Sequence, residues 1–156
     1  MWRELRGAYL GTLIGLVAQF LLGMATNLFV QVPHEHPGAN PPEYFSGVAQ
    51  SVIWAIFHGP SIWLVLHAVW GLLLVLSGFR LMYTAIRSRH RATIVTAVIG
   101  AIAMLFAGFN GGSYLNYHED FSSMIMASFF AIAVTAYVIG LYSLPHPQES
   151  PSSAAR

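Results

Sequence analysis

The chain has 156 residues, of which 56% are apolar and only 8% are charged, and its formal net charge is +1. This composition is far from that of a soluble domain, so the chain is expected to fold in lipid. All seven basic residues are arginine, which leaves no broad basic surface for a nucleic-acid partner. The absence of cysteine excludes disulfides, thiolate metal sites and iron–sulfur clusters.

Four apolar stretches approach the roughly 20 residues that a helix needs to cross a bilayer. The sequence has no alternating barrel pattern, and in lipid a helix satisfies its own backbone polar groups. We therefore predict an all-α integral membrane protein, a four-transmembrane-helix bundle forming one domain over residues 1–142. A cleaved signal peptide is the alternative for the first stretch, which is longer than a typical signal core. The predicted spans are approximately 9–32, 61–83, 92–109 and 121–142.

The arginines predict the orientation of the bundle. They lie before the first span, around the turn between the second and third spans, and at the end of the chain, whereas the other two loops hold four of the six acidic residues. Because cytoplasmic loops carry an excess of arginine, both termini are expected in the cytoplasm, below a cell inner membrane or a comparable bilayer. The arginines are Arg3, Arg6, Arg80, Arg87, Arg89, Arg91 and Arg156.

The loop after the first span contains four prolines between positions 33 and 42, which exclude a helix there. The apolar segment 43–58 that follows is too short to cross the bilayer. A fifth crossing would also invert the arginine asymmetry. We interpret this segment as a short interfacial helix on the outer face, or as an extension of the second span kinked at Pro60.

The last loop and the tail carry weaker signals. Asn110, Gly111 and Gly112 predict a turn after the third span, and Asp120 marks the capped start of the fourth. The segment 143–156 is rich in proline and serine, so we expect a disordered cytoplasmic tail.

Small residues recur every fourth position along the first span and include two overlapping GxxxG motifs. Such residues let a neighbouring helix approach closely in a membrane, where packing drives association. Packing within the bundle and homodimerisation both remain open. The predicted helix-packing residues are Gly7, Gly11, Gly15 and Gly23.

His67 is the leading candidate for a functional residue, because placing a titratable side chain inside hydrocarbon costs free energy. It lies about 10 Å below the outer end of the second span, at roughly 1.5 Å per residue. Asn27 and Ser128 are expected at a comparable depth, and Gln19 is a further intramembrane polar residue. A neutral imidazole bonded to Asn27 is one interpretation, and a proton-linked or substrate-contacting group is another.

A third interpretation makes His67 a ligand of haem b. A second axial ligand would come from another segment, with His118 and Met126 as the candidates. A divalent metal, Zn(II) or Cu(II), is a separate hypothesis. His34 and His36 flank Glu35, and alternate residues of an extended segment share one side, so both imidazoles could meet one cation.

Motifs of hydrolases and nucleotide-binding proteins, such as GxSxG, Walker A and HExxH, are absent, so an autonomous hydrolase is not expected. The leading hypothesis is a non-enzymatic subunit or assembly partner in a membrane complex, either a homo-oligomer or with another membrane protein. The first alternative is a haem- or metal-binding redox protein that uses outer-side histidines. The second alternative is a small-solute transporter, with pathway polar residues Gln19, Asn27, His67, Thr96 and Thr135.

Overall fold

The computed structural model describes residues 1–145, and within them it contains five α-helices and no β-strand. Four of these helices are long and apolar enough to cross a membrane. The prediction of an all-α, multi-pass membrane bundle is therefore confirmed. The four long helices are α1 (Trp2–Phe29), α3 (Ile62–Ser88), α4 (Arg91–Tyr117) and α5 (Asp120–Tyr142), and the short one is α2 (Tyr44–His58).

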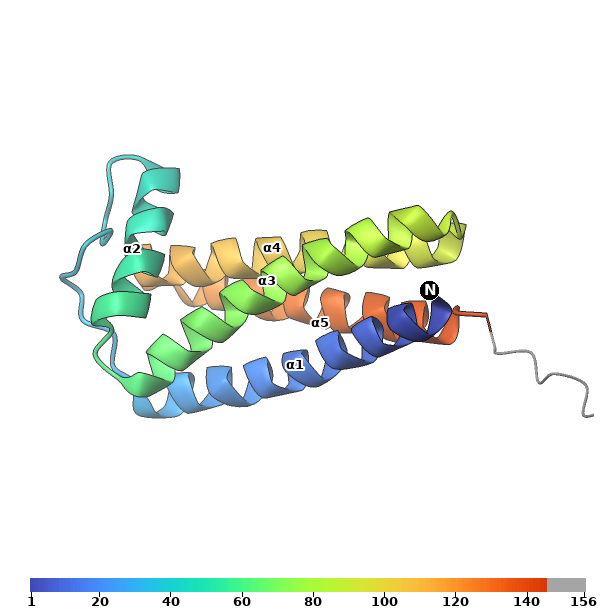
Figure 1. Cartoon of the computed structure of the whole chain (residues 1–156). Coiled ribbons are helices and arrows are strands. Elements are labelled where there is room, and N and C mark those ends of the chain that lie inside the picture. Colours follow the sequence, from blue (N-terminus) through green and yellow to red (C-terminus); the bar gives the residue numbers. More distant parts are fainter. Residues whose placement is uncertain (146–156) are drawn as a thin grey trace, which may run out of the picture.

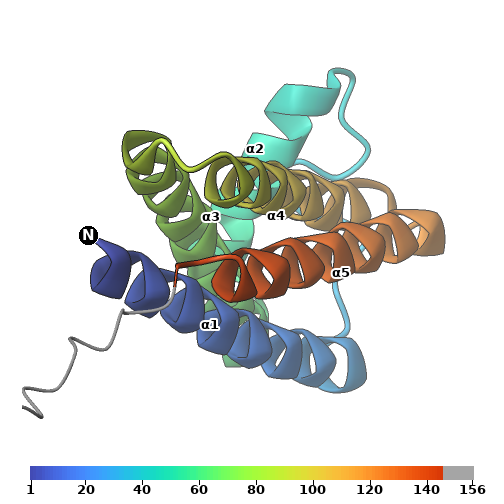
Figure 2. The same cartoon turned by 90° about the vertical axis from the view of Figure 1, so that its right-hand side faces the viewer.

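The long helices run side by side, and α2 lies across one end of the bundle (Figure 1). Helix α1 contacts α3 and α5, while α4 contacts α3 and, most extensively, α5 (Figure 2). We call the end that carries α2 the α2 end. The opposite end, where α1 begins and α3 turns into α4, is called the arginine end. It carries Arg3, Arg6, Arg87, Arg89 and Arg91.

Helix α2 is a separate element and not an extension of the second span. It packs on α3 and α4 but runs across the direction of the long helices (Figure 1), as an interfacial helix would. Gly59 and Pro60 separate it from α3, which begins with Ser61 as its N-cap. At the other end of α2, the Glu43 carboxylate accepts hydrogen bonds from the amides of Phe45 (3.0 Å) and Ser46 (2.6 Å). These bonds to backbone amides lower the pKa of Glu43, as expected for an N-cap carboxylate.

The predicted turn at residues 110–112 is wrong, because α4 continues through it to Tyr117 and ends at His118 in a left-handed conformation. The glycines serve close packing instead. A Cβ at Gly112 would lie 2.7 Å from a methyl carbon of Val48 in α2, and one at Gly111 would lie 3.2 Å from the sulfur of Met126 in α5. The glycines that predicted a turn therefore mark two tight helix contacts.

The core of the bundle is built around Tyr9 and Tyr137, both fully buried. Their rings meet edge to face at a centroid distance of 5.9 Å, and the Tyr9 hydroxyl donates to the Thr93 carbonyl at 2.8 Å. The Tyr137 ring lies over Gly100 of α4, where an added Cβ would come within 2.5 Å of it. Glycine is required at this position because the neighbouring atoms belong to a rigid ring.

The segment 143–156, predicted as a disordered tail, begins with packed residues. Ser143 donates to the Ile139 carbonyl at 2.7 Å and Leu144 is buried in the core. The tail beyond Pro145 lies outside the described residues.

Two glycines of α4 give a matched test of this packing. Gly100→Ala is expected to destabilise the bundle by about 1–3 kcal/mol, because the methyl group overlaps the Tyr137 ring. Gly108 has no neighbouring atom within 4 Å, so Gly108→Ala is expected to be neutral or stabilising by up to about 1 kcal/mol. Thermal unfolding in mild detergent measures both changes. Equal effects of the two substitutions would contradict this packing.

Candidate functional site

Three imidazoles gather at the α2 end, and we call His34, His36 and His118 the histidine cluster. The ring centroids of His34 and His118 are 4.6 Å apart, and those of His36 and His118 are 6.2 Å apart. His36 also stacks on Trp54 of α2 at 4.1 Å with an interplanar angle of 12°. Two histidines come from the proline-rich loop and one from the end of α4, so the fold unites residues about 80 positions apart.

Asn116 fixes this region, and the sequence analysis did not identify it. Its side chain is fully buried between α2, α4 and the proline-rich loop. With its amide oriented to satisfy these surroundings, the nitrogen donates to Ser51 Oγ at 2.6 Å and to the Gly38 carbonyl at 3.1 Å, and the oxygen accepts from the Val48 amide at 3.2 Å. The Asn116 carbonyl also accepts from the Asn40 amide at 2.9 Å. One residue therefore joins α2 and the loop to α4.

His36 occupies an unusual hydrogen-bonding position. Its Nδ1 lies 3.0 Å from the carbonyl oxygen of Pro37, and its Nε2 lies 3.0 Å from that of Leu115. Carbonyl oxygens only accept hydrogen bonds, so both contacts form together only when both ring nitrogens carry a proton. The ring also lies face to face with the indole of Trp54.

The proposed ligands His34, Glu35 and His36 are not brought together around one point. His34 faces His118, while both nitrogens of His36 face backbone carbonyls. Among residues 1–145, no group of three histidine, aspartate or glutamate side chains has an arrangement that could hold a metal ion. The geometry therefore gives the metal hypothesis no ligand set.

His67 lies in the interface between α1 and α3, where its partner is Gln19 and not Asn27. Gln19 Nε2 donates to the His67 carbonyl at 3.2 Å and lies 3.4 Å from His67 Nε2. The imidazole packs over Gly23, where an added Cβ would lie 3.0 Å from the ring, and Gln19 in turn packs against Gly71. Asn27 is exposed on the surface of α1. His67 Nδ1 and Gln19 Oε1 are buried without a hydrogen-bond partner among the described residues.

The candidate haem ligands have separate surroundings. His67 contacts α1, His118 contacts the other cluster histidines, and the sulfur of Met126 packs against Gly111. Two surface pockets open on the bundle, and neither is lined by any of these three residues. Ser128 donates to the Met124 carbonyl of its own helix at 2.9 Å and is exposed, so it does not approach His67 as a partner.

The electrostatics of the cluster are set by His118, which lies just beyond the end of α4. Burial lowers the pKa of His118 from the ordinary value of 6.5, and the charges of His34 and then His36 lower it further. Its Nε2 is buried without a hydrogen-bond partner among the described residues. The site therefore disfavours a proton on His118, which lies beside the rings of His34 and His36.

The chain matches no protein-family model, no curated protein and no solved structure. The function must therefore be inferred from this geometry.

The histidine cluster predicts a pH-dependent α2 end. The unfolded chain binds the His118 proton more readily than the folded chain, so folded stability is greatest above pH 6.5 and falls as acidification protonates His118. Backbone amides of residues 33–42 are expected to exchange faster at about pH 5 than at about pH 7.5, after correction for the intrinsic exchange rate. Hydrogen–deuterium exchange measured by mass spectrometry tests this.

His118→Gln is expected to abolish the acid-induced increase in exchange. His58→Gln is the matched control, because His58 is exposed at the end of α2 and lies outside the cluster. An increase that persists unchanged in His118→Gln would show that another group causes the response.

Proposed function

We propose that the protein is a non-enzymatic subunit or assembly partner of a membrane complex, which receives a transmembrane helix of its partner in a groove between α1 and α3. The observation that supports this is a surface cavity of about 250 Å³ with a glycine floor and an aromatic wall. The cavity is lined by Gly11, Gly15, Trp70, Leu73, Leu74 and Ser77.

The glycines of α1 divide into two groups. Gly15 and Gly23 face α3, where Leu74 and His67 occupy the space that a side chain would need. Gly7 and Gly11 have no neighbouring atom within 4 Å. Packing within the bundle therefore uses Gly15 and Gly23, whereas Gly7 and Gly11 remain exposed.

Side chains of α3 form the wall of the groove. Trp70 donates from its indole nitrogen to the Gly15 carbonyl at 2.9 Å, which fixes the ring beside the glycine floor. Leu73, also on α3, lines the groove and is half exposed. Helices associate in lipid through close packing and not through hydrophobic burial, so the exposed Gly11 beside the fixed Trp70 ring suits a second helix.

The two alternatives receive less support from the arrangement of side chains. The histidines form no three-ligand set among the described residues. The intramembrane polar residues do not share one path, because Gln19 pairs with His67, Thr96 with Tyr9, and Asn27 and Thr135 are exposed on different helices.

Photocrosslinking in native membranes tests the groove. The chain contains no cysteine, so Leu73→Cys provides a single thiol for benzophenone maleimide. We expect one protein adduct, whose mass distinguishes a second copy from a different protein. Adding Gly11→Leu is expected to reduce this adduct about tenfold, since overpacking costs roughly 1–3 kcal/mol.

Gly108→Leu is the control for this experiment. It places the same side chain at an exposed α4 glycine that also has no neighbour within 4 Å. The adduct should be unchanged in this variant. A protein that is crosslinked to nothing but lipid in native membranes would refute the assembly proposal.

We also propose that the arginine end faces the cytoplasm, since arginine excess marks cytoplasmic loops. Ser46→Cys at the α2 end and Ser88→Cys at the arginine end are matched single-thiol variants. In intact cells, a membrane-impermeant maleimide should label Ser46→Cys, whereas Ser88→Cys should be labelled only after permeabilisation. The reverse pattern would invert the orientation.

A further inference from the structure

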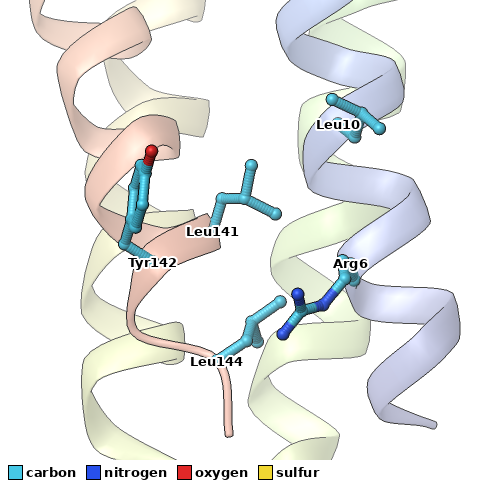
Figure 3. A pocket seen from close by; sticks show the side chains of 5 residues that line it. All are labelled: Arg6, Leu10, Leu141, Tyr142 and Leu144. Atoms are coloured by element: carbon cyan, nitrogen blue, oxygen red, sulfur yellow. The ribbon is translucent and has the colours of Figure 1, made fainter. Parts of the chain in front are cut away.

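A second surface pocket lies between α1 and α5 at the arginine end, far from the histidine cluster. Its volume is about 340 Å³, and Figure 3 shows the five side chains that line it. Leu141 points from α5 toward α1, and the Arg6 guanidinium reaches from α1 toward the end of α5, beside Leu144. The pocket is open to the surroundings, since Leu10 is 50% and Tyr142 is 82% exposed.

The charge at this pocket is not balanced by the described part of the chain. Arg6 has no carboxylate within ion-pair distance among residues 1–145. The only acidic residue of the neighbouring first turn, Glu4, is 3.4 Å from the N-terminal ammonium of Met1. Arginine presents a planar fork of donors that matches the oxygens of a phosphate group.

On α1, the polar and apolar residues of the pocket are ordered by depth along the bundle. Arg6 lies close to the start of α1, and Leu10 lies one turn further in, about 6 Å deeper at roughly 1.5 Å per residue. On the α5 side of the pocket, Leu141 lies within the helix, and Leu144 lies just beyond its last residue. A guanidinium at the mouth with Leu10 one turn deeper on the same helix matches a lipid, whose phosphate is at the membrane surface and whose acyl chain runs inward.

We propose that this pocket binds an anionic phospholipid, with its phosphate on Arg6 and an acyl chain against Leu10 and Leu141. The other arginines of this end raise the local concentration of anionic headgroups, whereas the pocket gives one lipid a defined place. A free phosphate would satisfy Arg6 but would leave the leucines uncovered. The phospholipid accounts for both halves of the pocket.

Native mass spectrometry of the full chain tests the site. Protein in mild detergent is offered an equimolar mixture of dioleoyl phosphatidylglycerol and dioleoyl phosphatidylcholine, and the retained lipids are counted. The wild type is expected to retain the anionic lipid preferentially. Arg6→Gln is expected to reduce that preference about tenfold, because one charge-assisted hydrogen bond to the lipid phosphate is lost.

Arg91→Gln is the matched control, because it removes the same charge from the same end but from α4, away from the pocket. Its lipid preference should stay close to that of the wild type. Equal losses in the two variants would assign binding to the general charge of this end and overturn the pocket. Arg6 is exposed, so a normal elution profile of Arg6→Gln is expected and is checked alongside.

A competition arm separates the lipid from free phosphate. Excess inorganic phosphate or glycerol phosphate should not displace the bound phosphatidylglycerol, because neither has an acyl chain to contact the leucines. Displacement by either compound would identify a simple phosphate site and overturn the lipid proposal.

Discussion

Close approach of helices at glycine positions is the interaction on which the rest of this bundle depends. In lipid, apolar side chains gain little by leaving one apolar surrounding for another, so helices must associate through tight packing. Large side chains on one helix meet glycines on the next: Leu74 against Gly15, Tyr137 against Gly100, and Val48 against Gly112. These three contacts join α1 to α3, α4 to α5, and α2 to α4. By the same rule, the exposed Gly11 lets a partner helix approach closely.

The two ends of the bundle differ in chemistry because they differ in how many backbone groups need hydrogen-bond partners outside a helix. At the α2 end, an irregular loop lies over the helices, and its backbone groups require partners. Asn116 supplies several of them, and His36 binds two further carbonyls. The arginine end consists of helix ends and one short turn, so its charged side chains are left to the surroundings. Polar groups are thus used internally at one end and presented outward at the other.

His67 illustrates how a costly residue can be accommodated inside the membrane. A single imidazole in hydrocarbon invites a functional interpretation. In the structure it lies over Gly23 and pairs with Gln19, whose amide also donates to the His67 carbonyl. A polar residue on each of two neighbouring helices, with a glycine opposite each, gives a compact contact. This arrangement explains why both residues lie in the interface between α1 and α3.

Sequence patterns were sufficient for the features that depend on composition over many residues. Hydropathy located all four spans, and the prolines of residues 33–42 correctly excluded a helix there. Local signals were less reliable: the glycines at 111 and 112 resembled a turn, although they lie within α4 as packing sites. A glycine permits both a left-handed turn and a close helix contact, and only the neighbouring chain decides between them.

The amino-acid sequence was sufficient to predict an all-helical membrane protein, because each long apolar segment in lipid must satisfy its own backbone hydrogen bonds. Tertiary structure alone decided which side chains meet. Asn116 carried no signal of burial, and His118 joins His34 only because the loop after α1 lies over the end of α4. Similarly, Arg6 and Leu141 face one pocket because the start of α1 lies beside the end of α5. Such contacts join residues distant along the chain, so no local pattern records them.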